Sequence, residues 1–164
     1  KKINPTGEAV NNITRALTFE HIFSDTYPLK TTVFLINGIL NGHCFLSNQF
    51  TPYIGFGIGS ALGSISGATS FQLDSIPDES SIDHFNGDPD SRSVTFAAQL
   101  KAGLGFNLCS QLKMFAEYRF LYLAQADYTF GSTSAPGHYT TSPWTVNINP
   151  QHYNMAIIGI DFSF

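Results

Sequence analysis

The chain is 164 residues long, which is the length of a single domain. Charged residues make up 12 % of it, about half of the quarter usual in soluble proteins. The net charge is −4 and there are only eight Lys and Arg, which excludes the basic surface that nucleic-acid binding requires. No apolar run approaches the roughly 18 residues of a transmembrane helix, yet aromatic residues reach 14 %. Apolar residues that are abundant but diluted by alternation are typical of transmembrane β-strands.

The N-terminal quarter carries the weaker strand patterns. Residues 1–12 are polar and are expected to form a loop or a trimmed N-terminus. They hold no apolar signal segment, so the leader of an exported protein would already have been removed. Residues 13–24 and 30–41 alternate imperfectly and predict two strands, separated by a corner at Tyr27-Pro28.

Residues 51–66 alternate between large apolar side chains and glycine. The apolar positions are Ile54, Phe56, Ile58 and Leu62, and the glycines are Gly55, Gly57, Gly59 and Gly63. Because glycine leaves no side chain to pack, a column of glycines predicts the crowded, sharply curved inner wall of a small barrel.

The clearest strand pattern covers residues 92–108. Apolar residues occupy the even positions from Val94 to Leu108, and mostly polar or small residues occupy the odd ones. Residues 112–130 repeat the pattern, so the two segments predict a hairpin with a tight turn at 109–111. A turn of odd length pairs even with even positions and places both apolar sets on one face.

The chain ends in a further alternating segment, residues 151–164. Ala156, Ile158, Ile160, Phe162 and the terminal Phe164 share one parity, while Gly159, Asp161 and Ser163 share the other. A strand with one apolar and one polar face fits a barrel wall between lipid and lumen.

The connections between these strands alternate in length. The turns at 41–49 and 109–111 are short, whereas 67–91 and 131–150 are long and rich in Gly, Pro, Ser, Asp and Thr. Outer-membrane barrels have short periplasmic turns and long outer loops, so both long segments are expected on the outside, the first as a solvated acidic loop. Trp144 in the second is expected to anchor it at the lipid interface.

Three segments resemble the small outer-membrane β-barrel proteins of Gram-negative bacteria, of the opacity-protein and surface-antigen kind. They are Phe50-Thr51-Pro52-Tyr53 with the alternating glycines after it, the hairpin with Phe115-Ala116-Glu117-Tyr118-Arg119-Phe120, and the ending Gly159-Ile160-Asp161-Phe162-Ser163-Phe164. The ending is similar to the signal that the barrel-insertion machinery reads, with Ile160, Phe162 and Phe164 as its apolar residues. The resemblance implies an all-β, antiparallel, up-and-down transmembrane barrel in the bacterial outer membrane, in contact with its lipids and lipopolysaccharide.

The family's barrels usually have eight strands, and this sequence predicts six. About eight is the smallest number seen in membranes. Either a first hairpin is missing or trimmed, or further strands lie unrecognised in 1–12, 67–91 or 131–150. The first explanation is favoured, because the two long loops contain too many Gly and Pro for another strand pair.

Several charged or amide side chains share the predicted lumen face: Gln99, Lys101, Glu117, Arg119, Gln125 and Asp127. Lys101 is expected across the hairpin from Arg119, with Glu117 within diagonal reach. The favoured interpretation is an ion-pair network that plugs a narrow barrel; the alternative is a constriction that filters ions or small solutes.

Cys44 and Cys109 both fall at the predicted periplasmic turns, where a disulfide between them is one of the open alternatives. No CxxC or HExxH spacing indicates a metal site, and the five scattered His residues do not suggest a catalytic constellation. We therefore expect no enzyme activity, metal or cofactor.

The sequence leaves three functions open. The first is a structural, antigenic or adhesive surface protein acting through 67–91 and 131–150, with a host-surface or envelope-complex partner. The second is a narrow porin-like channel, and the third is a soluble ligand-binding β-barrel.

Overall fold

The computed structural model describes residues 2–3, 7–9, 13–15, 23–42, 49–72, 81–136 and 143–162, and every regular element among them is a β-strand. This confirms the all-β prediction. The described residues contain no helix able to span a membrane. The strands are β1 (Lys2–Ile3), β2 (Gly7–Ala9), β3 (Ile13–Arg15), β4 (Phe23–Thr26), β5 (Leu29–Asn41), β6 (Phe50–Ile65), β7 (Thr69–Gln72), β8 (Ser91–Cys109), β9 (Leu112–Leu123), β10 (Ala126–Phe130), β11 (Trp144–Ile148) and β12 (Gln151–Phe162).

The chain divides into two compact units, and the long strands β5, β6 and β8 contribute residues to both. One unit, here the sheet unit, comprises residues 32–61, 94–125 and 149–164. The other, the core unit, comprises residues 1–31, 62–93 and 126–148.

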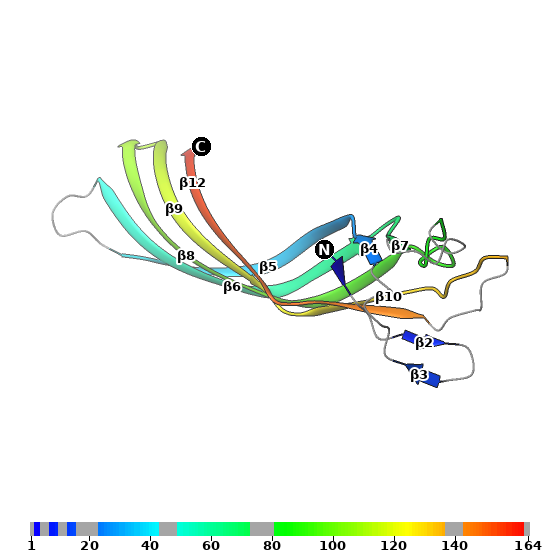
Figure 1. Cartoon of the computed structure of the whole chain (residues 1–164). Helices are drawn as coiled ribbons and strands as arrows, with labels where there is room; N and C mark the ends of the chain where they lie inside the picture. The colour runs from blue at the N-terminus through cyan, green and yellow to red at the C-terminus, as the bar shows by residue number, and fades with distance from the viewer. Residues whose placement is uncertain are drawn as a thin grey trace. The chain divides into compact units, whose positions relative to one another are not determined.

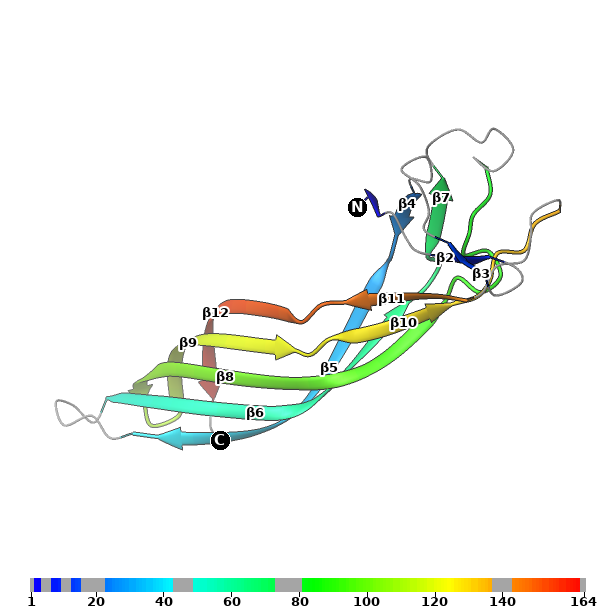
Figure 2. The same ribbon diagram turned by 60° about the horizontal axis from the view of Figure 1, so that its bottom comes forward.

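The sheet unit contains most of a five-stranded sheet in the order β12-β9-β8-β6-β5. The strands of this sheet run side by side and curve together (Figures 1 and 2). The order is that of an up-and-down meander, as predicted, but among the described residues the sheet is open, with β5 and β12 at its edges, and no closed barrel is found.

The register confirms the predicted hairpin. Leu100 lies opposite Phe120 and Lys101 opposite Arg119, so even positions pair with even and odd with odd. The same holds between β9 and β12, where Ala116 pairs with Ile158. The only irregularity in the β8–β9 register lies between Asn107 and Cys109, beside the turn.

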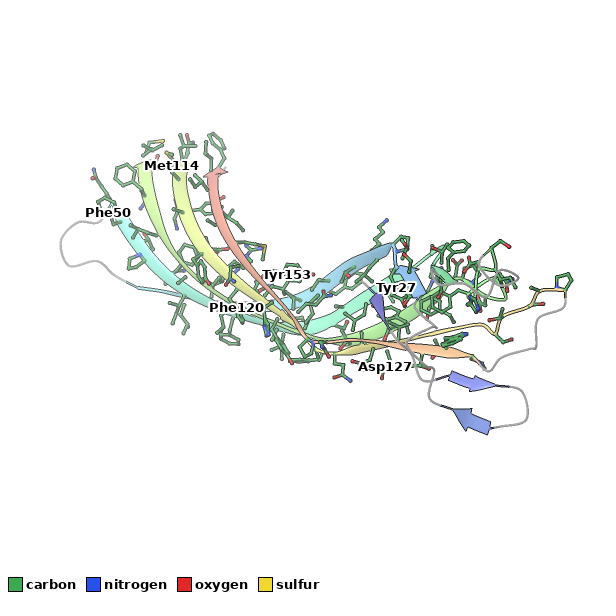
Figure 3. The ribbon with its side chains drawn as sticks, viewed as in Figure 1. Tyr27, Phe50, Met114, Phe120, Asp127 and Tyr153 are labelled. Carbon is green, nitrogen blue, oxygen red and sulfur yellow. The ribbon has the colours of Figure 1, made fainter. Side chains whose placement is uncertain are left out.

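The two faces of this sheet differ sharply. All but three of the exposed large hydrophobic side chains in the described residues have even numbers, the exceptions being Ile39, Phe71 and Tyr153. The odd face is crowded: Ala61 and Ala97 are buried with Leu123, and Val33, Leu35 and Leu121 pack against them. Figure 3 shows Phe120 and Tyr153, neighbouring positions of opposite parity, on opposite sides of the curved sheet. We call these the apolar face and the polar face.

Glycines make the crowding of the polar face possible. A Cβ on Gly55 would lie 2.7 Å from Cε of Lys101, and a Cβ on Gly103 would lie 2.7 Å from Cε1 of Tyr53. Real Cβ atoms do not approach so closely, so each glycine makes room for a long side chain from the neighbouring strand. The sequence predicts this crowding at the glycine column of 51–66, and the structure identifies Lys101 and Asn37 as side chains that fill the space at Gly55 and Gly57.

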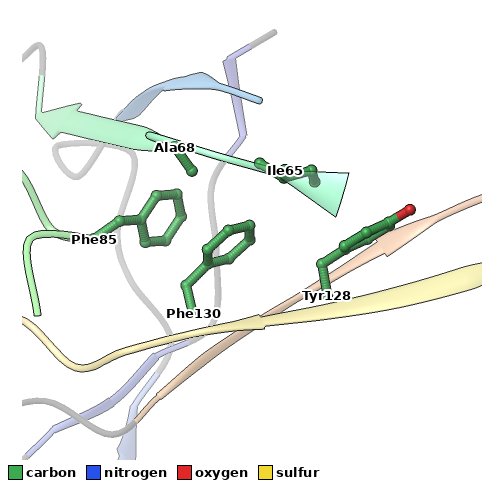
Figure 4. Packing of buried hydrophobic residues seen from close by; sticks show 5 residues of the cluster. All are labelled: Ile65, Ala68, Phe85, Tyr128 and Phe130. Atoms are coloured by element: carbon green, nitrogen blue, oxygen red, sulfur yellow. The ribbon is translucent and has the colours of Figure 1, made fainter. Parts of the chain in front are cut away.

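The core unit is built around an aromatic cluster. Ile65, Ala68, Phe85, Tyr128 and Phe130 are buried together (Figure 4), and the rings of Phe85 and Phe130 stack with centroids 4.8 Å apart. Tyr27 stacks on Phe130 at 5.9 Å. Burying several aromatic rings in one place is a large apolar contribution to stability.

The core unit contains three further sheets, and several of their strands lie where the sequence predicted loop. β10 pairs with β11, β4 pairs with β1 and β7, and β2 pairs with β3. The expectation that 1–12, 67–91 and 131–150 form loops is therefore wrong at β1, β2, β7 and β11. The Gly and Pro of both long segments flank short strands rather than excluding them.

The predicted strand 112–130 is interrupted at Ala124-Gln125, between β9 and β10. Its partner is interrupted opposite, at 149–150, between β11 and β12. The register is nevertheless continuous, since Leu123 pairs with Gln151 and Ala126 with Ile148. The parity of the buried side chains changes across the break, from odd at Leu123 to even at Tyr128 and Phe130.

Candidate functional site on the polar face of the sheet

The polar face carries a charged cluster on β6, β8 and β9. Tyr53 on β6 reaches across β8, where Gly103 makes room for its ring, and donates a hydrogen bond of 3.0 Å from its hydroxyl to Oε2 of Glu117 on β9. A glycine on the middle strand thus lets side chains from β6 and β9 meet.

Glu117 is the centre of the cluster. Its other oxygen, Oε1, accepts hydrogen bonds from Nη2 and Nε of Arg119 at 2.6 and 2.9 Å. The Glu117 side chain is only 4 % exposed, whereas that of Arg119 is 31 % exposed. A buried carboxylate requires such charge-assisted donors to both oxygens, and Glu117 has them.

The predicted placement of Lys101 is confirmed. It lies directly across from Arg119 in the β8–β9 register, and its alkyl chain lies over Gly55 of β6. The one ion pair found among the described residues is that of Arg119 with Glu117, so Lys101 takes part in none there.

Gln99 is also part of this face and is 6 % exposed. Its Nε2 donates a hydrogen bond of 2.9 Å to Oδ1 of Asn37 on β5. Asn37 in turn lies against Gly57 of β6, so this contact repeats the Tyr53 arrangement: two polar side chains meet above a glycine.

Asp127 does not belong to this cluster, which corrects its predicted lumen position. It lies in the core unit, on β10, is exposed, and its carboxylate accepts a hydrogen bond from the amide of Asn147 on β11. The break at Ala124-Gln125 changes the parity, so Asp127 faces away from the buried Tyr128 and Phe130. Gln125 lies in the break, with an exposed side chain, and its carbonyl accepts a hydrogen bond from the Thr95 hydroxyl.

Sequence reasoning missed two members of the cluster, Tyr53 and Asn37. The available signal was the glycine opposite each on the neighbouring strand, at Gly103 and Gly57. Glycine alternation predicts a crowded wall but does not say which side chains from the neighbouring strands fill it.

The apolar face of the sheet unit is uncovered in the structure. The exposed fraction is 70 % at Val94, 62 % at Leu100 and 79 % at Ile158. The predicted insertion residues Ile160 and Phe162 are also exposed, while Phe164 lies outside the described residues. A contiguous apolar surface of this kind marks contact with another apolar phase or partner.

The exposed faces of β10 and β11 in the core unit are polar, although Leu62 and Phe71 of this unit are also exposed. On β10 and β11 the outward side chains are Asp127 and Thr129, paired with Asn147 and Thr145. Lys30 on β5 and Arg92 on β8 are exposed as well. The apolar exterior is therefore concentrated in the sheet unit.

The two long segments meet through several hydrogen bonds inside the core unit. Asn86 and Ser134 exchange two, at 2.7 and 2.8 Å, and Gly131 donates to the carbonyl of Asp88 at 3.0 Å. His84 is buried, with its ring Nδ1 3.2 Å from the carbonyl of Ser70. The expectation of a solvated loop over 67–91 is wrong at Ala68, Ser70, His84 and Phe85, which are buried, whereas Asp88 and Asp90 are exposed.

Trp144 is half-buried rather than aimed outward. Its ring makes an edge contact with Phe85 at a centroid distance of 6.4 Å and packs against the aromatic cluster. The sequence did not predict this packing, and the role of Trp144 as a lipid-interface anchor stays a prediction.

Cys109 is exposed and is a free thiol among the described residues. Cys44 lies outside them, so the suggested disulfide remains a prediction.

No protein-family model matches the chain, and no curated protein or solved structure matches it either.

Proposed function

We propose that this chain forms the wall of an outer-membrane β-barrel, with its apolar face on the lipid and its polar face toward the lumen. The observation that carries the proposal is the concentration of exposed large apolar side chains on the even-numbered face of one sheet. Water does not stabilise such a surface, whereas the hydrocarbon of a bilayer does.

The charged side chains of the sheet support the same orientation. Glu117, Arg119 and Lys101 all lie on the face opposite the apolar one. A transmembrane barrel keeps polar residues inside and apolar residues outside, whereas a soluble ligand-binding barrel has the reverse arrangement. The third function left open by the sequence is therefore the least favoured.

Closure of the wall requires strands beyond the five described. The outer edges of β5 and β12 would expose unpaired backbone groups to lipid, which costs several kcal/mol for each group. In a five-stranded antiparallel meander the first and last strands run in the same direction, so an all-antiparallel closure needs an odd number of added strands. Three added strands give eight, the smallest barrel seen in membranes.

The core unit supports a structural or adhesive role at the surface. Its aromatic cluster and the bonds between Asn86 and Ser134 would present the ends of both long segments on a fixed frame. A preorganised surface loses less entropy on binding than a free loop. We propose that this surface of the core unit binds a host-surface or envelope-complex partner.

A narrow porin-like channel is the second candidate function. The observation that favours it is a lysine on the lumen face that forms no ion pair among the described residues. A plug alone would not need this extra charge.

Membrane insertion can be tested by refolding the full chain in detergent, adding phospholipid vesicles and floating them on a density gradient. We expect the chain to float with the vesicles and, before boiling, to migrate differently on a denaturing gel. A chain that stays at the bottom as a monodisperse, detergent-free monomer would refute the proposal and revive the soluble barrel.

A further inference from the structure

The charges of the polar-face cluster do not balance. Lys101 and Arg119 are two cations directly opposite each other, and in the part of the chain that the structure describes Glu117 is the one carboxylate paired with Arg119, and none is paired with Lys101. Two positive charges and one negative charge leave an excess of one positive charge. The nearest other charged pair along the strands is Lys113 and Asp161, which lie opposite each other in the β9–β12 register, so their formal charges sum to zero. The Lys113 alkyl chain extends over Gly105 of β8, and no ion pair joins these two residues in the described structure.

The hydrogen bonds and the ion pair that Glu117 makes are to residues other than Lys101. Its Oε1 accepts from Arg119 and its Oε2 from Tyr53. Lys101 also extends in the other direction, over Gly55 of β6, away from β9. The excess charge therefore resides on the Lys101 ammonium group rather than being shared within the cluster.

The local sequence keeps this charge on the polar face. Gly55 lets the alkyl chain lie flat, since a Cβ there would approach Cγ of Lys101 to 2.8 Å. A cation held on a surface with low-dielectric walls raises the local concentration of anions.

We propose that Lys101 makes the lumen of this barrel selective for small inorganic anions, with chloride as the simplest example. The proposal rests on the membrane barrel proposed above and names the solute class that its polar face admits. Arg119 is committed to Glu117, so it narrows the passage and adds little attraction, while Lys101 supplies the charge that an entering anion meets. Rings or clusters of Lys and Arg select anions in this way in other pores.

The test is the reversal potential of the full chain in planar bilayers across a tenfold KCl gradient. We expect the wild-type chain to admit chloride in preference to potassium. Lys101→Gln should lower the chloride-to-potassium permeability ratio severalfold, and Lys101→Glu should reverse the preference. Lys30→Gln makes the same chemical change at an exposed site in the core unit and should leave the ratio unchanged.

Each outcome decides between the two proposals. A chain that floats with vesicles but gives no conductance, or conducts with the same selectivity in all three variants, overturns the anion inference and leaves the membrane barrel standing. A chain that does not float overturns both. If Lys101→Glu fails to fold by gel migration, Lys101→Gln and the charge-conserving Lys101→Arg carry the test, because only the first should lose selectivity.

Discussion

At the scale of single residues, Glu117 shows how a sheet can bury a carboxylate. Both of its oxygens have donors, one from its own strand and one from β6, two strands away. The Tyr53 hydroxyl is the donor that a conservative substitution can remove without changing the packing of the ring.

We predict that Tyr53→Phe lowers the free energy of unfolding by about 1–3 kcal/mol, because it leaves a buried carboxylate oxygen without a donor. Tyr153→Phe is the matched control. Tyr153 is exposed and bonds Gln151 at 2.7 Å, so its hydroxyl should contribute less than about 0.5 kcal/mol. Denaturant unfolding in detergent measures both, and equal effects would contradict the role assigned to Tyr53.

Gly103 has a role that can be separated from backbone flexibility. We predict that Gly103→Ala destabilises the chain by about 1–3 kcal/mol, because the added methyl group would overlap the Tyr53 ring. In a Tyr53→Ala background the same change should cost little, since the ring is gone. A double-mutant cycle measures this coupling, and additive effects would show that the glycine is needed for another reason.

At the scale of elements, alternation of apolar and polar residues was sufficient to predict the strongest strands. The hairpin of β8 and β9 follows from it, including the pairing of Lys101 with Arg119, because a period of two over many residues has no helical competitor. β7 and β11 could not be found in this way. They are four and five residues long and owe their place to pairing with β4 and β10, which is a tertiary effect.

The break at Ala124-Gln125 was also invisible in the sequence. Alternation of apolar residues continues through it, from Tyr122 to Phe130, so the pattern alone assigns Phe130 to the same side as Phe96. The structure buries Phe130 almost completely and leaves Phe96 52 % exposed.

This difference gives a prediction for the element. Phe130→Ala should cost about 3–5 kcal/mol of stability, as is typical for a buried aromatic residue, whereas Phe96→Ala should cost much less in detergent. Thermal or denaturant unfolding of the two variants provides the comparison. A similar loss of stability in both variants would instead support the uninterrupted strand that the sequence predicts.

At the scale of the whole molecule, the proposed contact with lipid depends on one division of the surface. Exposed apolar side chains are concentrated on the even-numbered face of the sheet unit, whereas the exposed faces of β10 and β11 are polar. The lipid-covered part of the wall should therefore end near the breaks at 124–125 and 149–150.

The most direct measurement of this division compares two neighbouring isoleucines on β12. Ile157 is half-buried on the polar face and Ile158 is exposed on the apolar face. Because they are consecutive residues, their side chains point to opposite faces of the sheet but would lie at nearly the same depth in the bilayer. Each is replaced by Trp in a Trp144→Phe background, and the chain is reconstituted into bilayers that contain brominated lipid. We expect strong fluorescence quenching for Ile158→Trp and weak quenching for Ile157→Trp. Equal quenching at both positions, or none at either, would contradict the assignment of the apolar face to lipid.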